Sequence, residues 1–401
     1  MRILIVEPHA TGHHASYLRW LVQGAVQRRW SVAVATTREA LAHPTVAGIA
    51  DDFHDVRIHI MDDVLPRDGP SSKTQLMRRE FEYWKAFKRV AAEVRSTTSV
   101  DAAILPYVDY CFHALAILGS PFKELPWSGI SMRLTVRSDA TKRRVFLPFK
   151  WRFAIRLLSD ATLKALFVIN PSVQDTPSNW GSYGLLSKLR YLRDPADFRA
   201  GGTRVSARAT LGIADDRVAM LVFGSIDERK GIDALVQQVA SQDGLDNYVV
   251  ILAGKESATL RDQLRATPCA ELLSQKRLIV MDRFLSDEEQ DLVFAAADVV
   301  WVGYRNHQYM SGVLVLAGRA GLPVVGTPVG EIGRLIVRYN IGITASIGSP
   351  TDVTSALRAL LDVRTRIDMG RRARAAFAGH TVDDFAATVM GAFNSLPSTP
   401  C

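Results

Sequence analysis

The segment Phe223-Gly-Ser-Ile-Asp-Glu-Arg-Lys-Gly231 joins a strand to a helix. It follows the apolar run 218–223, which has the length of a buried strand, and it precedes a stretch of helical period. Lys230 and Gly231 stand at the start of that helix, where backbone N–H groups lack intrahelical partners and the helix dipole is positive. A lysine ammonium beside such amides makes a good anion site. The alternative is that Lys230 is a solvated loop residue and Gly231 a turn glycine.

Short apolar strands alternate with helical stretches on both sides of this segment, which predicts an α/β fold with parallel sheets. The stretch 194–202, rich in Pro, Gly and charge, is the expected linker. We therefore expect two Rossmann-like domains facing each other across a deep cleft, with ligand bound at the carboxyl ends of both sheets. Strands are expected at 3–6, 31–35, 102–105, 167–169, 218–223, 248–253, 278–281, 299–302 and 323–326.

Two helices of the second half are predicted from local signals. Ser286, followed three residues later by Glu289, has the pattern of a capping box, so a helix is expected over 287–297. The spacing of apolar residues in 259–273 predicts one continuous helix there.

A second polar loop ends at Ser311 and leads into a helix that is apolar on nearly all sides. Ser311 is a natural N-cap. The N–H groups of Gly312, Val313 and Leu314 would then face whatever occupies the cleft. A plain capped core helix is the alternative.

The turn after the first strand contains Thr11-Gly-His-His14. Gly12 would let a ligand approach the backbone closely. His13 and His14 could bind phosphate or sugar hydroxyls or act as a base, or they could be ordinary surface histidines. No third ligand is near them in the sequence, so no metal site is expected. The turn lacks the dinucleotide fingerprint, and the chain has neither a Walker loop nor a nucleophile elbow.

The composition is that of a globular protein, because 48% of the 401 residues are hydrophobic and 22% are charged. Three cysteines at irregular separations predict neither a disulfide framework nor a metal site. The chain enters a strand at Arg2, which leaves no room for a signal peptide, so a cytoplasmic protein is expected. The excess of 49 Lys and Arg over 41 Asp and Glu favours anionic partners. Nucleic acid is not expected among them, because no finger or RNA-binding signature is present.

The segment Arg133–Arg156 is strongly basic and holds a single acid, Asp139, with aromatic and aliphatic residues interleaved. Such a mixture suits contact with an anionic membrane surface, where each nearby cation adds about 1 kcal/mol. The protein would then be peripheral at the inner membrane. A loop and a core helix with a solvated basic face fit the segment equally well.

The second half resembles the GT-B glycosyltransferases, most closely the large retaining glycosyltransferase family 4. In that family the C-terminal domain opens with a strand and Gly-Arg-x-x-x-x-Lys-Gly, and Gly224, Lys230 and Gly231 stand at the matching places. Gly12 is similar to the family's glycine-rich first loop. The resemblance covers nearly the whole chain and is strongest from about 217 to 345. Later family positions, from Glu-Ala-x-x-x-Gly-x-Pro-Val-Val and Gly-Gly-x-x-Glu, are matched by Ala317, Gly321, Pro323, Val324, Val325 and Gly330.

This resemblance implies a GT-B fold with residues 1–195 as an acceptor domain, 196–370 as a nucleotide-sugar donor domain, and 371–401 as a helical tail packing back on the first domain. It implies transfer of a hexose from a nucleotide-diphosphate sugar to a glycan, lipid-linked or small-molecule acceptor, in bacterial polysaccharide or glycoconjugate biosynthesis. The reaction would retain the anomeric configuration and use neither a metal nor a cofactor.

Several family positions differ here. The arginine of the first motif is Ser225, and the paired glutamates fall on Gln308 and Leu316. Gln308 could still hydrogen-bond sugar hydroxyls, whereas Leu316 cannot hydrogen-bond a ribose. Arg229, Arg283 or Arg305 could replace the missing arginine at the phosphates.

We expect catalytic roles for Lys230 and Gln308, at family positions, and for His13 in the first turn; the histidine that the family has in the middle of its first domain falls near Met132 or Arg133 and is absent here. Lys230 and the helix start at 312–314 would stabilise the charge that develops on the leaving diphosphate. The implied donor-binding set is Gly12, Gly224, Ser225, Arg229, Lys230, Arg283, Arg305, Ser311, Gly312, Val313 and Leu314.

Two other classes of function remain open. The missing glutamates also fit a catalytically inert GT-B protein that binds a sugar nucleotide or glycan as a scaffold. An enzyme of the same fold with other chemistry, such as epimerisation of a sugar nucleotide or phosphorolysis, is the other alternative.

Overall fold

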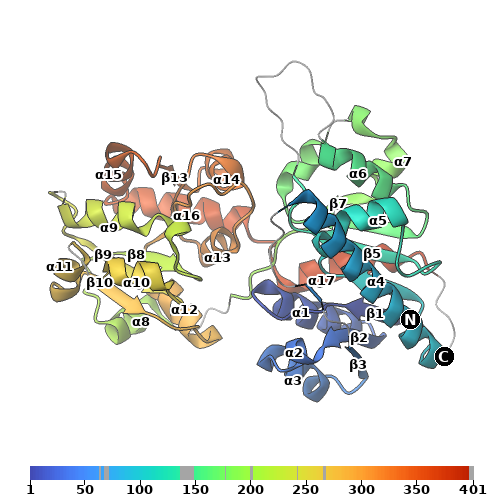
Figure 1. Cartoon of the computed structure of the whole chain (residues 1–401). Helices are drawn as coiled ribbons and strands as arrows, with labels where there is room; N and C mark the ends of the chain where they lie inside the picture. The colour runs from blue at the N-terminus through green and yellow to red at the C-terminus, as the bar shows by residue number, and fades with distance from the viewer. Residues whose placement is uncertain are drawn as a thin grey trace. The chain divides into compact units, whose positions relative to one another are not determined.

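The computed structural model describes residues 1–62, 65–66, 72–135, 149–176, 178–198, 202–241, 243–264 and 268–396. Its contacts divide the chain into two compact units (Figure 1). The first unit comprises Met1–Arg193 and Val382–Cys401, and the second comprises Asp194–Thr381. No helix of the described residues is long and apolar enough to cross a bilayer.

The first unit is built on a parallel sheet with the strand order β3-β2-β1-β4-β5-β6-β7. Chain order reverses between β1 and β4, so the loops after these two strands diverge and leave room between them. The strands are β1 (Arg2–Val6), β2 (Ser31–Thr37), β3 (Val56–Met61), β4 (Ala102–Leu105), β5 (Trp127–Ser131), β6 (Leu163–Val168) and β7 (Leu189–Tyr191). The helices are α1 (His13–Gln27), α2 (Arg38–Leu41), α3 (Pro44–Asp52), α4 (Lys73–Thr97), α5 (Phe112–Leu118), α6 (Phe149–Leu158), α7 (Tyr183–Leu186) and α17 (Val382–Met390).

The second unit repeats this plan with the strand order β10-β9-β8-β11-β12-β13, again parallel, and the order reverses between β8 and β11. The strands are β8 (Val218–Phe223), β9 (Tyr248–Ala253), β10 (Leu278–Met281), β11 (Val299–Val302), β12 (Val324–Gly326) and β13 (Gly342–Thr344). The helices are α8 (Arg204–Leu211), α9 (Ile232–Ser241), α10 (Ala258–Leu264), α11 (Cys269–Ser274), α12 (Asp287–Ala296), α13 (Gly312–Ala320), α14 (Gly330–Tyr339), α15 (Pro350–Ala359) and α16 (Val363–Ala376). Two Rossmann-like domains are thus confirmed.

Central strands form where the sequence is continuously apolar. β9 is buried along its whole length, and β8 is buried from Val218 to Val222, as expected for parallel strands covered by helices on both faces. The predicted capping box is also present, since the Ser286 hydroxyl accepts the Glu289 N–H and the Glu289 carboxylate accepts the Ser286 N–H. It starts α12 at Asp287, as predicted.

The single helix predicted over 259–273 is wrong. The structure has α10 and α11 there, and Pro268 is the residue immediately before α11. Pro268 stands outside the helix with a φ of −94° and a ψ of 2°, and proline lacks the N–H that a continuous helix would need there. Residues 265–267 lie outside the described ranges.

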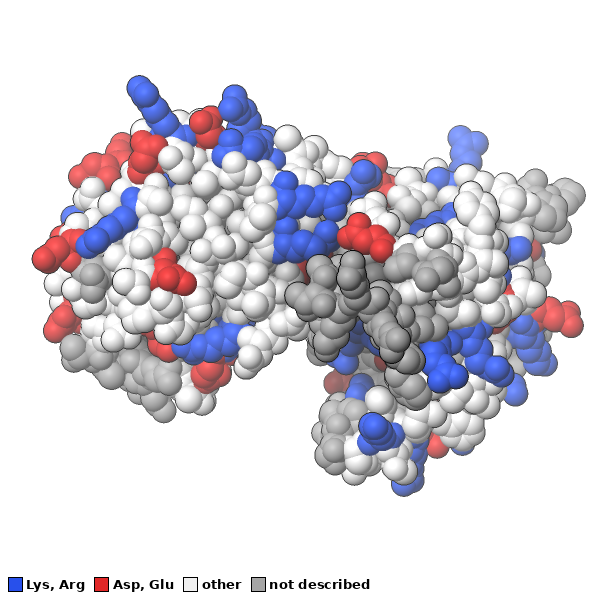
Figure 2. Space-filling view, turned by 90° about the horizontal axis from the view of Figure 1, so that it is seen from above, with Lys and Arg blue, Asp and Glu red and all other residues white. Residues whose placement is uncertain are grey.

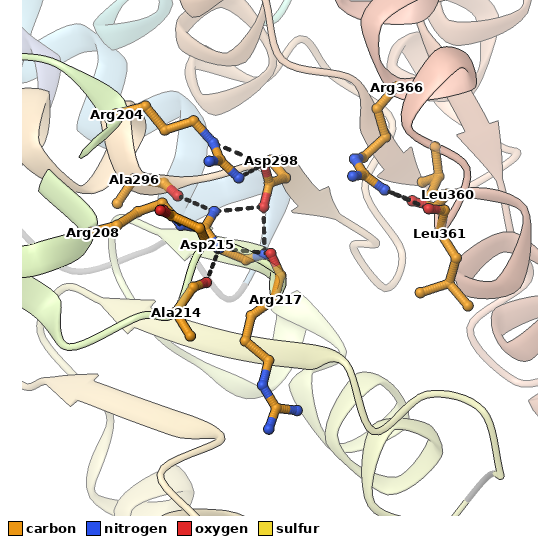
Figure 3. A network of polar contacts seen from close by, with 11 residues as sticks. Arg204, Arg208, Ala214, Asp215, Arg217, Ala296, Asp298, Leu360, Leu361 and Arg366 are labelled. Carbon is orange, nitrogen blue, oxygen red and sulfur yellow. Dashed lines mark hydrogen bonds and ion pairs between the residues drawn. The ribbon is translucent and has the colours of Figure 1, made fainter.

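A buried arginine ties the start of the second unit to its sheet (Figure 3). Arg208 of α8 is 1% exposed, and it donates to the Asp298 carboxylate at 2.9 Å. Asp298, just before β11, also accepts the N–H of Ala219 in β8 at 2.8 Å and the guanidinium of Arg204. Arg208 further donates to the carbonyls of Ala214, Arg217 and Ala296. A buried charge of this kind is tolerated only because it is paired and hydrogen-bonded.

The last part of the chain is divided between the two units. The second unit extends to Thr381, where α16 packs on α13, so residues 371–381 of the expected tail lie in the second unit. From Val382 the chain returns to the first unit, and α17, red in Figure 1, lies beside the dark blue α1. Gly24 allows this approach, because a Cβ there would stand 2.4 Å from that of Ala386.

Candidate functional site

Lys230 lies at the carboxyl edge of the second sheet, at the point where the strand order reverses. It ends a short 3-10 turn, Glu228–Lys230, and Gly231 follows in the left-handed conformation before α9. A Cβ on Gly231 would stand 2.7 Å from the carbonyl oxygen of Gly303, so only glycine fits at this junction. The Lys230 side chain turns back along β8, and its ammonium donates to the carbonyl of Phe223.

An aromatic ring holds the cationic groups of this loop together. Tyr304, buried just after β11, has the Lys230 Nζ 5.1 Å and the Arg229 Cζ 5.0 Å from its ring centroid. Trp301 of β11 donates from Nε1 to the Lys230 carbonyl at 2.7 Å. Two neighbouring cations therefore lie on one ring at the reversal between β8 and β11.

The Lys230 ammonium is only partly compensated. It is 2% exposed, and burial, with the nearby Arg229, lowers its pKa from 10.5 to about 8, against a weaker opposing effect of Asp227. The group is still mostly protonated at pH 7. A buried cation whose charge is disfavoured gains most from an anionic ligand, since the ligand supplies the missing opposite charge.

The start of α13 adjoins this cation. A Cβ built on Gly224 would lie 3.6 Å from Lys230 Nζ and 4.0 Å from a methyl group of Val313. Ser311 caps the helix as predicted, and its hydroxyl accepts the Leu314 N–H at 3.4 Å. The amide of Leu314 is therefore not available to a ligand, contrary to the expectation, and the amides left for one at this end are those of Gly312 and Val313.

A pair of glycines fixes the loop between β8 and Lys230. Gly224 has a φ of +89° and Gly254, after β9, a φ of +147°. A Cβ on Gly254 would stand 1.9 Å from the carbonyl oxygen of Gly224, so the two backbones touch. Ser225, the next residue, is exposed.

The other predicted donor-binding residues are placed differently. Arg283 pairs with Glu289 at the start of α12. Arg305 pairs with Asp233 at 2.7 Å and is exposed. Gln308 lies exposed in the loop before α13. Of the three arginines considered for the phosphates, only Arg229 shares the Tyr304 ring with Lys230.

In the first unit, His14 rather than His13 contacts a carboxylate. Gly12 caps α1 with a φ of +62°, and a Cβ there would meet nothing within 4 Å. His13 is exposed, with its ring 4.5 Å from that of His14. His14 Nδ1 lies 3.2 Å from the carboxylate of Glu7, which is fully buried at the end of β1.

Glu7 and Tyr110 also belong to this site, although they were not among the residues predicted from the sequence. The Tyr110 hydroxyl donates to Glu7 at 2.9 Å and lies 3.1 Å from His14 Nδ1. Burial raises the pKa of Tyr110 well above its usual range, and the Glu7 charge adds to this, so the phenol stays protonated. The backbone N–H of His9 gives Glu7 a further bond at 3.1 Å. The signal available in the sequence was an acidic residue, Glu7, directly after an apolar strand. Tyr110 lies 103 residues further along the chain, so no local pattern links it to Glu7.

The basic segment Arg133–Arg156 is only partly described, because residues 136–148 lie outside the described ranges. At its start, the backbone N–H groups of Met132 and Arg133 donate to Asp109. At its end, α6 carries Lys150, whose ammonium donates to the Arg133 carbonyl at 2.6 Å. On the face seen in Figure 2, Lys and Arg are spread over the surface with Asp and Glu among them. Among the described residues, no group of three or more His, Cys, Asp or Glu could hold a metal ion.

The segment that contains Lys230 and the start of α13 is similar to known proteins. Residues 217–363 match the family described as Glycosyl transferases group 1. The D-inositol 3-phosphate glycosyltransferase of Geodermatophilus obscurus is 32% identical over 214 residues, which cover 49% of this chain and 45% of that relative. The enzyme of the same name from Saccharomonospora viridis is 31% identical over 183 residues, 43% of this chain and 42% of the relative. The chain thus spans less than half the length of the curated relatives it matches.

Solved structures extend the similarity to the whole chain at the level of the fold. Sucrose-phosphate synthase from Thermosynechococcus elongatus superposes with a TM-score of 0.71 at 16% identity, covering 99% of both chains. Anabaena HepE, solved in complex with UDP, gives a TM-score of 0.67 at 15% identity, covering 99% of this chain and 100% of that one. The fold is therefore GT-B, and residues 217–363, which match the Glycosyl transferases group 1 family, hold Lys230 and the start of α13.

Proposed function

We propose that this protein is a glycosyltransferase that moves a sugar from a nucleotide-diphosphate sugar to a glycan, lipid-linked or small-molecule acceptor. The observation that carries the proposal is the buried, partly uncompensated ammonium of Lys230 beside Gly224 and the start of α13. The donor diphosphate gains negative charge as the glycosidic bond breaks. Fixed positive groups at that position stabilise the transition state more than the ground state.

The donor is proposed to bind in the second unit. Lys230 and Arg229 would contact the diphosphate, with the amides of Gly312 and Val313 completing the anion site. Anabaena HepE has been solved in complex with UDP and with UDP-glucose, which makes a uridine nucleotide the first candidate here. Retention of the anomeric configuration and independence of a metal are part of the proposal, because Lys230 and the helix start could take the role that a divalent cation plays elsewhere.

The acceptor is proposed to bind in the first unit, near Gly12 and His14. The ring of His14 is oriented by Glu7 and Tyr110, so it offers a fixed polar edge for a hydroxyl group. We further propose peripheral contact with an anionic membrane through the basic part of this unit that includes Arg133–Arg156, at the site of bacterial polysaccharide or glycoconjugate synthesis.

An inert scaffold remains the second candidate, because Leu316 and Gln308 stand where the resembling family has glutamates. Such a protein would use the same anion site without turnover. Transfer or donor hydrolysis with any acceptor would exclude it.

Thermal unfolding in the presence of UDP, GDP, ADP, CDP or dTDP tests the proposal. A nucleotide at about 100 times its Kd stabilises the folded protein by about 2.7 kcal/mol, which is readily seen as a raised Tm. A shift with one base would identify the donor class and lead to assays with the corresponding sugars. The absence of a shift with all five, with and without candidate acceptors, would refute a nucleotide-sugar donor.

A further inference from the structure

One surface of the first unit combines exposed apolar side chains with cations. On α4, Met77, Phe81, Trp84 and Lys88 follow one another at helical spacing and share one face. Met77 and Phe81 are exposed, although the other apolar face of α4 is buried in the core. Phe81 and Trp84 stack with an interplanar angle of 11°.

Lysines border these rings. Lys85 Nζ lies 5.5 Å from the centroid of Phe81, and Lys88 Nζ lies 5.0 Å from that of Trp84. Aromatic rings with cations beside them are typical of the boundary between water and lipid, where the ring meets the apolar phase and the cation meets phosphate.

The α4 face continues onto α5. Trp84 donates from Nε1 to the carbonyl of Gly119 at 2.9 Å, which joins the two helices at this point. Ile117 and Leu118, at the end of α5, are each 46% exposed. Two large aliphatic side chains beside two aromatic ones are more than the scattered apolar residues of an ordinary surface.

A groove of about 990 Å³ opens beside Ile117 and Leu118, between α5 and α6. Three cations line it: Lys123, Arg152 and Arg156. None of them forms an ion pair with a described residue. The acidic residue that lines the groove, Asp160, already accepts hydrogen bonds from the hydroxyl and the backbone N–H of Thr162. The groove therefore presents an apolar wall and a cationic rim to an outside partner.

The end of α5 lies away from the candidate site, whereas the start of α4 lies beside it, since the ring of Tyr83 stacks on that of Tyr110 and its hydroxyl lies 2.8 Å from His9 Nε2. α5 follows β4 and leads back to β5, so its last residues lie at the amino edge of the parallel sheet. Glu7 and His14 lie at the carboxyl edge. A partner held at the end of α5 therefore contacts the edge of the sheet opposite to Glu7 and His14.

We propose that this surface, made of the exposed face of α4, the end of α5 and the groove beside α6, binds a bilayer that contains anionic phospholipid. The proposal deepens the membrane contact of the proposed function and rests on it. The cations would contact lipid phosphates, and the apolar side chains would enter the headgroup boundary. A second copy of the chain fits less well, since a symmetric dimer would place these cations against one another. The acids beside this surface are Glu82, which is half-buried and paired with Lys85, and Glu124, which is exposed.

Flotation of the full chain with lipid vesicles tests this. We expect binding to vesicles of phosphatidylcholine with phosphatidylglycerol at low salt, and little binding to phosphatidylcholine alone. Binding should fall sharply at 1 M salt, where charges are screened within about 3 Å. Absence of binding to the anionic vesicles at low salt overturns the proposal.

Variants locate the surface. Lys88→Glu and Arg152→Glu should each lower partitioning at least about fivefold, the value of one near-surface cation. Phe81→Ser and Leu118→Ser should lower it as well. Arg364→Glu in α16 is the matched control for charge, since the residue is exposed in the second unit. The control for apolar exposure is Phe284→Ser, because Phe284 is 84% exposed there.

Two outcomes would overturn the assignment. Patch variants that float as well as the wild type would show that the chain binds lipid elsewhere. A concentration-dependent dimer in light scattering that the patch variants abolish would assign the surface to a second copy. Nucleotide-dependent Tm shifts are measured on the same variants. A variant that loses vesicle binding but keeps the nucleotide-dependent Tm shift supports the role of this surface in membrane binding. A protein that binds vesicles but shows no Tm shift with any nucleotide contradicts the proposed glycosyl transfer and leaves the membrane proposal intact.

Discussion

Replacing Lys230 by Gln should separate the stability of the protein from its function. The substitution removes the charge of the group that donates to the carbonyl of Phe223 and keeps a polar amide in the same side chain. Burial already lowers the pKa of Lys230 to about 8, so the folded protein disfavours this charge. The variant should therefore be as stable at pH 7 as the wild type or more stable, while binding a nucleoside diphosphate more weakly.

The expected loss can be given a magnitude. Removing one fixed donor from a developing oxyanion costs about 2.7–4 kcal/mol in the barrier, or about 10²–10³ in kcat. Under the proposed function Lys230 contacts charge of the same kind, and Arg229 already has a carboxylate partner, Asp227, at 3.5 Å. Turnover measured with the donor identified by thermal shift should fall by this factor.

The pH dependence of binding provides an independent assay. In the free protein the Lys230 pKa is about 8, and a bound diphosphate raises it. Binding therefore takes up a proton above pH 8, and affinity should fall as pH rises through 8, by at most about tenfold per pH unit. Titration calorimetry between pH 7 and 9.5 should show this slope for the wild type, and the Lys230→Gln variant should lack it.

Two results would refute the reasoning. A Lys230→Gln protein with unchanged nucleotide affinity and turnover would show that the ammonium does not contact the donor. A variant that unfolds at much lower temperature would show that the ammonium has a structural role at the end of β8. Arg364→Gln, an exposed change in α16, controls for a general effect of lost charge.

Three further changes probe the framework of the sites. Asp298→Ala should destabilise the second unit by about 3–5 kcal/mol in urea unfolding, because it leaves the buried Arg208 guanidinium without its carboxylate. Gly254→Ala should lower donor turnover by about 10², measured as kcat, since its Cβ would displace the Gly224 loop and a shift of about 1 Å is enough for such a loss. Tyr110→Phe should cost about 1.5–3 kcal/mol of unfolding free energy, because a buried carboxylate loses a hydrogen bond of 2.9 Å.

Matched controls test the first two of these predictions. Asp215→Asn alters a carboxylate 4.0 Å from Arg208 that is largely exposed, and it should change stability by less than about 0.5 kcal/mol. Gly348→Ala changes a glycine whose Cβ would meet nothing within 4 Å, so turnover should be unchanged. Equal effects of a test variant and its control would remove the specific role assigned to Asp298 or Gly254.

The sequence was informative where structure is local. Continuous apolar runs predicted the central strands, and Ser286 with Glu289 predicted the start of α12. Lys230 could be placed at a helix start from its immediate neighbours. One helix was predicted over 259–273 because the spacing of apolar residues shows only which face of a helix would be buried. It does not show that a helix is interrupted, which depends here on Pro268, the residue before α11.

The contacts that were missed join residues far apart in the chain. Tyr110 reaches Glu7 only because β4 pairs with β1, an order that local patterns do not specify. Likewise, Arg305 was considered for the phosphates, but it lies in the loop after β11 and its partner Asp233 lies 72 residues earlier, in α9. Pairing of long cationic side chains depends on which carboxylates the fold brings within about 4 Å.

The two units place opposite charges at equivalent positions, and this favours a division of labour between them. In the second unit, the reversal of strand order presents Lys230 and Arg229 on one ring, and the lowered pKa of Lys230 reflects a positive charge that is not fully neutralised. In the first unit, the reversal presents the carboxylate of Glu7, already satisfied by Tyr110 and His14. A phosphate-bearing donor is attracted to the two cations of the second unit and gains nothing from the carboxylate of the first unit. A neutral hydroxyl is suited to the edge of an oriented imidazole, so the electrostatics favour donor binding in the second unit and acceptor binding in the first.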